Sequence, residues 1–172
     1  MEKDVVLLYP GCCIYEIVIL TYFLKCTGSD VVYCSVDGGA IEAMEGYSVN
    51  ADCCLNDVKL CKLRSFIIPG GDAAQIEQDV VFKMLCKLNG RNIWIGAICA
   101  GVDVLEKAGI LKGRRFTRNA DADCIRDGNI ITARANAYVD FAIEMGKALE
   151  LFEDEADLQE TIDFWKLFKR AE

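Results

Sequence analysis

The residue best placed to do chemistry is Cys99, which follows the apolar run 93–98 and precedes small residues and a helical pattern. We interpret the run as a strand that turns sharply into a helix, with Cys99 on the turn. Small residues at Ala97, Ala100 and Gly101 permit a tight bend that leaves the thiol exposed, as in a nucleophile elbow. The first N–H groups of the following helix would stabilise a thiolate there.

A buried structural cysteine is the alternative, because free cysteine is among the most buried residue types. The position of Cys99 on a turn favours a reactive thiol. The other cysteines include four that lie among apolar residues and are simplest to interpret as small core side chains, namely Cys26, Cys34, Cys61 and Cys86.

The cysteine pattern argues against a metal site. The chain has ten cysteines and no histidine, and its only close pairs are the adjacent ones at 12–13 and 53–54. Structural zinc sites usually require a C-x-x-C spacing or histidine ligands. We therefore expect no metal and no cofactor.

Composition limits the class of protein further. With 27 acidic and 19 basic residues the formal net charge is −8, which disfavours binding to nucleic acid or to anionic membranes. The apolar runs are too short to span a bilayer, and the chain enters a strand directly after residue 4 without the pattern of an export signal. We expect one domain, 1–172, in a soluble cytoplasmic protein with reduced thiols.

Apolar periodicity predicts alternating strands and helices. Strands are expected at 5–9, 31–36, 65–68, 93–98 and 130–133, and a small hairpin at 40–53. Helices are expected at 14–25, 73–88, 100–108, 138–152 and 153–170. This alternation indicates an α/β fold with a mostly parallel sheet between helical layers. Active sites of such folds lie beyond the carboxyl ends of the strands, where Pro10-Gly11, Pro69-Gly70-Gly71 and Cys99 all fall.

In their order and spacing, several segments resemble the ThiJ/PfpI superfamily, the glutamine-amidotransferase-like group that includes PfpI-type proteases and the Parkinson-disease-linked deglycase. The resemblance covers nearly the whole chain. The segments are VVLLYPG at 5–11, Tyr15-Glu16, IIPGG at 67–71, AICAG at 97–101, GILKGRR at 109–115 and DGNIITA at 127–133.

The resemblance implies a flavodoxin-like three-layer α/β/α sandwich, a homodimer and a small-molecule substrate. It makes Cys99 the nucleophile and Glu16 its carboxyl partner, with N–H groups near Gly70, Gly71 and Ala100 as an oxyanion hole. The rest of the pocket could use Tyr15, Asp72, Arg118, Asn119 or Asn136. Apolar side chains that could meet a second subunit are Ile14, Tyr15, Tyr22 and Phe23.

One departure from the family pattern is informative. Many members carry a histidine just after the nucleophile or in the segment that reads Phe116-Thr117-Arg118-Asn119 here, and this chain has none. A cysteine–histidine dyad is therefore impossible, and a second identical subunit cannot supply one. The sequence argues against peptidase activity of the family's type.

Glu16 has two possible roles. It could be an ordinary acid in the first turn of the helix 14–25, where it complements the helix dipole. Alternatively, a protonated Glu16 could donate a hydrogen bond to the Cys99 thiolate.

Three functions are compatible with these residues. The first is an enzyme of the hydrolase, hydratase or glyoxalase/deglycase type, in which Cys99 attacks a small electrophile and Glu16 moves the proton. The second is an oxidative-stress sensor or protective protein that oxidises Cys99 without turnover. The third is a non-catalytic relative of the fold.

Overall fold

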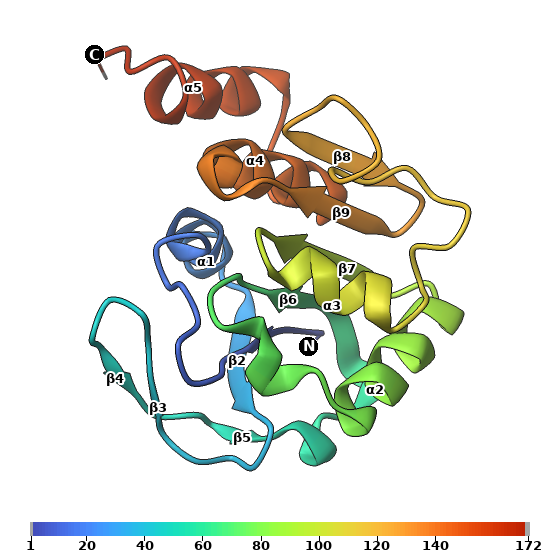
Figure 1. The fold of residues 1–172 in the computed structure, drawn as a ribbon. Helices are drawn as coiled ribbons and strands as arrows, with labels where there is room; N and C mark the ends of the chain where they lie inside the picture. Colours follow the sequence, from blue (N-terminus) through green and yellow to red (C-terminus); the bar gives the residue numbers. More distant parts are fainter. Residues whose placement is uncertain (1, 171–172) are drawn as a thin grey trace.

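The computed structural model describes residues 2–170, so the two ends of the predicted domain 1–172 lie outside the described residues. A sheet of seven strands in the order β5-β2-β1-β6-β7-β9-β8 forms the centre (Figure 1). All neighbours are parallel except β8 and β9. The strands are β1 (Lys3–Leu7), β2 (Asp30–Ser35), β5 (Cys53–Cys54), β6 (Leu63–Ile68), β7 (Trp94–Ile98), β8 (Cys124–Asp127) and β9 (Ile130–Ala133).

The central strands form because their apolar residues are buried on both faces. In β1, β6 and β7 almost every position is inaccessible, including successive residues such as Val5, Val6 and Leu7. Continuous apolar runs of this kind are typical of strands covered on both sides by helices.

Helices cover the two faces of the sheet. The helices α1 (Val18–Cys26) and α4 (Tyr138–Ala148) pack together on one face, and α2 (Asp79–Gly90) and α3 (Gly101–Lys107) on the other. The last helix, α5 (Glu155–Trp165), packs on α1, where the Trp165 ring lies 5.8 Å from that of Tyr22 and 5.9 Å from that of Phe23. The predicted three-layer α/β/α sandwich is therefore confirmed. No helix within residues 2–170 is long and apolar enough to cross a membrane.

Two predicted helices begin later than expected. Residues 14–17 form a bend and a turn, and α1 starts only at Val18, so Glu16 precedes the helix instead of occupying its first turn. The predicted helix 73–88 is a short 3-10 turn, η3 (Ala73–Ile76), followed by α2, because the extended backbone of Gln78 (φ −143°, ψ 155°) separates them. The two C-terminal helices are also shorter than predicted, since α4 ends at Ala148 and α5 covers only 155–165.

The predicted hairpin 40–53 is present as two short antiparallel strands, β3 (Ile41–Glu42) and β4 (Ser48–Val49). Its predicted end at Cys53 belongs instead to β5, which joins the main sheet beside β2. The apolar pattern does not predict strand β8. Three further 3-10 turns are η1 (Leu55–Asp57), η2 (Leu60–Lys62) and η4 (Ala135–Ala137).

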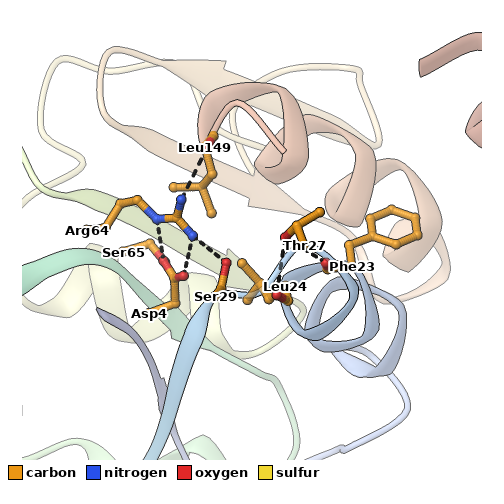
Figure 2. A network of polar contacts seen from close by, with 8 residues as sticks. All are labelled: Asp4, Phe23, Leu24, Thr27, Ser29, Arg64, Ser65 and Leu149. Carbon is orange, nitrogen blue, oxygen red and sulfur yellow. Dashed lines mark hydrogen bonds and ion pairs between the residues drawn. The ribbon is translucent and has the colours of Figure 1, made fainter. Parts of the chain in front are cut away.

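An ion pair between the buried Asp4 and the partly buried Arg64 joins strands at the amino-terminal edge of the sheet (Figure 2). The Arg64 guanidinium donates from Nε to Asp4 Oδ1 at 3.1 Å and from Nη2 to Asp4 Oδ2 at 2.5 Å. Ser65 Oγ adds a hydrogen bond to Asp4 at 2.7 Å, and Arg64 also reaches Ser29 Oγ and the Leu149 carbonyl. This network joins β1, β6, the segment before β2 and the end of α4.

Candidate active site

Cys99 lies on the turn between β7 and α3, at the carboxyl edge of the sheet. Its backbone is left-handed, with φ at +55°, a conformation that costs a non-glycine residue roughly 1–2 kcal/mol. The Cys99 N–H still donates to the Ala133 carbonyl of β9 at 2.9 Å, so the strained residue is held by the sheet. The predicted sharp strand-to-helix turn is therefore present.

Glycines allow the neighbouring strand end to approach this turn. A Cβ atom at Gly70 would lie 2.6 Å from Cys99 Cβ, and one at Gly101 would lie 2.6 Å from the Ile68 carbonyl oxygen. Both distances are shorter than van der Waals contact. Any side chain at either position would push β6 and the turn apart.

The loop between β1 and α1 carries Glu16 and is held from two sides. The β3–β4 hairpin binds it through Gly11 N–H to Glu42 O at 2.8 Å and through Met44 N–H to Cys12 O at 2.9 Å. On the other side, Cys13 N–H donates to the Gly70 carbonyl at 2.9 Å. The loop is thereby fixed against the Pro69-Gly70-Gly71 turn.

Glu16 is 1% exposed and points into this junction. The Gly70 N–H donates to its Oε2 at 2.6 Å, and the Tyr15 hydroxyl donates to its Oε1 at 3.3 Å. A Cβ at Gly70 would lie 2.7 Å from Glu16 Oε2 and 2.6 Å from Cys99 Cβ, so the carboxyl and the thiol-bearing carbon flank the same glycine. Burial before the helix, beside Cys99, excludes the interpretation of Glu16 as an exposed first-turn acid.

The pKa values of both groups are raised. Burial is the largest effect and raises the pKa of the Glu16 carboxyl, although hydrogen bonds from Gly70 N–H, Cys99 and Tyr15 oppose it. Burial also raises the pKa of the Cys99 thiol, followed by the charge of Glu16 and its hydrogen bond. The Ala100 N–H and the Arg118 charge lower the Cys99 pKa but do not outweigh these effects. The pair therefore retains a proton, whereas the helix N-terminus alone would favour the thiolate.

A cavity of about 460 Å³ opens beside the thiol. It is lined by Cys99, Thr117, Arg118, Ala133, Arg134 and Ala135. Two larger hollows, one of about 720 Å³ bordered by Tyr22 and α5 and one of about 760 Å³ bordered by Cys26, are lined by no residue of the predicted site.

The predicted pocket residues separate into two groups. Tyr15 contacts Glu16, Arg118 lines the cavity, and the Ala100 N–H faces the thiol. Gly71 shapes the turn, because its φ is +110° and a Cβ there would lie within van der Waals contact of the Gly11 carbonyl. The Gly70 N–H, predicted as an oxyanion donor, is occupied by Glu16.

Three other candidates lie outside the cavity. The exposed Asp72 carboxylate accepts a hydrogen bond from Gln75 Nε2 at 2.9 Å. Asn119 braces its own loop, accepting from Phe116 N–H at 2.8 Å and donating to the Arg114 carbonyl at 2.9 Å. Asn136 is exposed in η4 and does not line the cavity.

Sequence reasoning missed the side of the cavity formed after β9. Arg134 and Ala135 follow the carboxyl end of β9, so the rule that located Cys99 also applies to them. Cys13 was also missed: burial, and next the charge of Glu16, raise the pKa of its thiol to about 11. Among residues 2–170, no group of three or more cysteine, aspartate or glutamate side chains is arranged to hold a metal ion.

The chain is similar to a family of known proteins. Residues 2–148 match the model of the DJ-1/PfpI family. A deglycase of Thermococcus kodakarensis is 29% identical over 150 residues, which cover 77% of this chain and 83% of that protein. Protein dj-1beta of Drosophila melanogaster is 28% identical over 168 residues, covering 86% of this chain and 89% of that protein.

Solved structures show the same fold. The crystal structure of a DJ-1 superfamily protein from Agrobacterium tumefaciens aligns with a TM-score of 0.84 at 23% identity, covering 98% of this chain and all of that one. The crystal structure of a mutant DJ-1 superfamily protein from Salmonella typhimurium aligns with a TM-score of 0.82 at 24% identity, covering 99% of this chain and all of that one.

Proposed function

This chain belongs to the DJ-1/PfpI family, and we propose that it is an enzyme in which Cys99 adds to a small electrophilic substrate while Glu16 carries the proton. Several of its relatives are named deglycases, which supports a carbonyl compound or its adduct with an amine as the substrate class. Hydrolysis, hydration and glyoxalase-type conversion all begin with the same addition step.

The observation that carries the proposal is the burial of Glu16 beside Cys99 without a cation. Among residues 2–170, no lysine or arginine forms an ion pair with Glu16. Burial without a cation raises the pKa of this carboxyl, so its carboxylate form is a stronger base than that of an exposed glutamate. Glu16 is therefore suited to accept a proton from Cys99 and to return it.

The addition step balances without histidine. The Cys99 S–H proton moves to the Glu16 carboxylate as the sulfur attacks the carbonyl carbon and a C–S bond forms. The π electrons of the carbonyl bond move to its oxygen, and Glu16 returns the proton to that oxygen. The product is a neutral thiohemiacetal, and the pair is ready to move a second proton.

The raised pKa of Cys99 favours this enzyme over a peroxide sensor. Peroxides react with the thiolate, so a thiol whose pKa is raised by burial and by Glu16 is poorly activated toward them. In the proposed enzyme the thiol loses its proton only when a substrate is attacked.

The test is a substrate screen of the purified protein beside Cys99→Ser. Methylglyoxal, its adducts with amines, isocyanides and simple amides are the substrates, and Cys61→Ser, which changes an exposed cysteine, is the control. We expect turnover of a carbonyl substrate that is lost in Cys99→Ser and retained in Cys61→Ser. Turnover that survives in Cys99→Ser contradicts the proposal. Absence of turnover together with a peroxide-dependent mass gain at Cys99 supports the sensor instead.

We also propose that the protein is a homodimer of the reducing cytoplasm that uses the start of α1 as its interface. Tyr15, Val18 and Tyr22 are each about half exposed there. Of the other residues suggested by the sequence, Phe23 is 7% exposed and packs on Trp165, so it faces the protein's own core. Light scattering at micromolar concentration that reports a monomer contradicts the dimer.

A further inference from the structure

The cavity beside Cys99 is lined by two cations and no acid. Two of its six lining residues are arginines, Arg118 and Arg134, and the others are small or uncharged. The chain as a whole carries a formal charge of −8, so this pair is a local exception to the overall charge. Both side chains are about half exposed and therefore accessible from solvent.

Neither arginine is saturated by the protein. Arg118 uses Nη2 for the Asp103 carboxylate at 2.9 Å and for the Cys99 carbonyl at 3.4 Å. Arg134 approaches the Asp123 carboxylate through Nη1 at 3.5 Å, and within residues 2–170 its side chain makes no shorter polar contact. A guanidinium has five N–H donors, so several on each side chain remain available to a ligand.

The two acidic partners do not cancel the positive character of the cavity. Asp103 lies on α3 and Asp123 precedes β8, and neither lines the cavity. Exposed ion pairs of this kind are weak, so a ligand that accepts from both arginines can compete with them.

We infer that the substrate of Cys99 carries an anionic group, a carboxylate next to its electrophilic carbon, which Arg118 and Arg134 bind beside the thiol. The inference rests on the proposed function and narrows its substrate class to small carbonyl compounds of the 2-oxo acid type. Arginine suits this role because its planar N–H groups match the two oxygens of a carboxylate. Arg118 also fixes the strained turn through the Cys99 carbonyl, which links anion binding to the position of the nucleophile.

Alkylation with two matched reagents tests the inference without requiring turnover. Iodoacetate and iodoacetamide present the same electrophilic carbon and differ in having a carboxylate or a neutral amide. The ratio of the two rates is measured at Cys99 by peptide mapping, with exposed Cys61 in the same sample as the internal reference. We expect the iodoacetate-to-iodoacetamide ratio to be about tenfold higher at Cys99 than at Cys61, the size of one charge-assisted hydrogen bond.

Variants assign the effect to the two arginines. Arg134→Gln and Arg118→Gln should each lower the ratio at Cys99 toward that at Cys61, whereas Arg134→Lys should retain part of the difference. Arg91→Gln is the control, because it removes an exposed positive charge at the end of α2, away from the cavity. High salt should reduce the effect in the unmodified protein. An unchanged ratio in the double variant Arg118→Gln with Arg134→Gln would overturn the inference.

The outcomes separate this inference from the proposed function. If Cys99 reacts with both reagents at the ratio found for Cys61, the anion site is wrong and the nucleophile stands. If neither reagent labels Cys99, both proposals fail. The turnover experiment makes the same distinction: glyoxylate, an aldehyde with a carboxylate, should have a higher kcat/KM than neutral methylglyoxal, and the reverse order overturns only the inference.

Discussion

The two edges of the sheet each bury a carboxyl group, but with different partners. At the amino-terminal edge, Asp4 is fully buried and receives two bonds from the Arg64 guanidinium and one from the Ser65 hydroxyl. At the carboxyl edge, Glu16 is equally buried but receives its bonds from a backbone N–H and a tyrosine hydroxyl. The first carboxyl pairs with a cation, whereas no cation among residues 2–170 pairs with the second.

Under the proposed function, burial alone does not distinguish an acid that stabilises the fold from one that transfers a proton. A carboxylate whose oxygens are both bonded to a guanidinium fixes the strands that it joins. A carboxyl that has only neutral donors changes its protonation state at lower cost, because no ion pair is broken. The partner of a buried acid therefore indicates its role.

Replacing the acid at the carboxyl edge should have the largest effect. Glu16→Gln keeps the shape and removes the exchangeable proton, so turnover should fall by about 10² to 10⁴-fold, the usual contribution of a general acid–base group. The stability of the folded state should instead rise in Glu16→Gln relative to the unmodified protein, by an amount that depends on pH. Because burial raises the pKa of Glu16 in the folded state, its contribution to stability is present below the unfolded pKa and is lost as pH rises through the folded pKa.

The Tm of Glu16→Gln relative to the unmodified protein should therefore increase as pH rises from the acidic range to the mildly alkaline. Thermal unfolding of both proteins across this range measures the difference. A Tm difference that shrinks as pH rises would show that Glu16 is ionised and stabilises the fold in that form.

Breaking the ion pair at the amino-terminal edge should instead destabilise the fold and leave the chemistry intact. Asp4→Asn leaves the Arg64 guanidinium without its carboxylate, and removal of one partner of a buried pair costs about 3–5 kcal/mol. Denaturant unfolding measures the loss, and the alkylation rate of Cys99 should not change under folding conditions. Asp79→Asn is the matched control, because its pair with Lys83 is exposed and such pairs contribute about 0–1 kcal/mol. Equal losses in the two variants would contradict the structural role of Asp4.

A methyl group added at the carboxyl edge should have a smaller effect, which falls on both the stability of the fold and the reactivity of Cys99. Gly70→Ala places a Cβ against Cys99 Cβ at 2.6 Å and Glu16 Oε2 at 2.7 Å, and such overpacking costs about 1–3 kcal/mol. Gly90→Ala is the control, since a Cβ there meets no atom within 4 Å. We expect slower Cys99 alkylation only in Gly70→Ala, and unchanged alkylation there would mean that the carboxyl–thiol junction tolerates separation.

The sequence predicted the sheet well because its strands are buried on both faces. Runs such as 65–68 and 93–98 are apolar and end at glycine, proline or small residues, and these signals are local. The break at Gln78 has no such signal, because nothing in its neighbourhood marks an extended residue inside an apolar helical pattern. Strand β8 did have one: Asp127 and Ile130 flank a two-residue turn that contains Gly128, which is typical of a hairpin.

The parts of the candidate site that depend on the order of the strands were predicted. The parts that depend on the direction of side chains were missed. Cys99 and Glu16 follow strand ends, so the topology brings them to one edge of the sheet. Their pairing through Gly70, by contrast, depends on the conformation of the loop at 14–17. The apolar pattern of these residues predicts a helix there, so the loop could not be predicted from the sequence. Asp72 and Arg118 were both predicted as pocket residues. Only the structure shows that Asp72 bonds to Gln75 outside the cavity and that Arg118 lines the cavity.

The left-handed backbone of Cys99 has an evolutionary consequence. Glycine adopts this conformation without strain, so a lineage selected for thermal stability alone would drift toward glycine at position 99 and lose the thiol. Strain held at one residue motivates the hypothesis that its side chain has a function. A chain with this fold and glycine at the turn would lack both the backbone strain and the thiol.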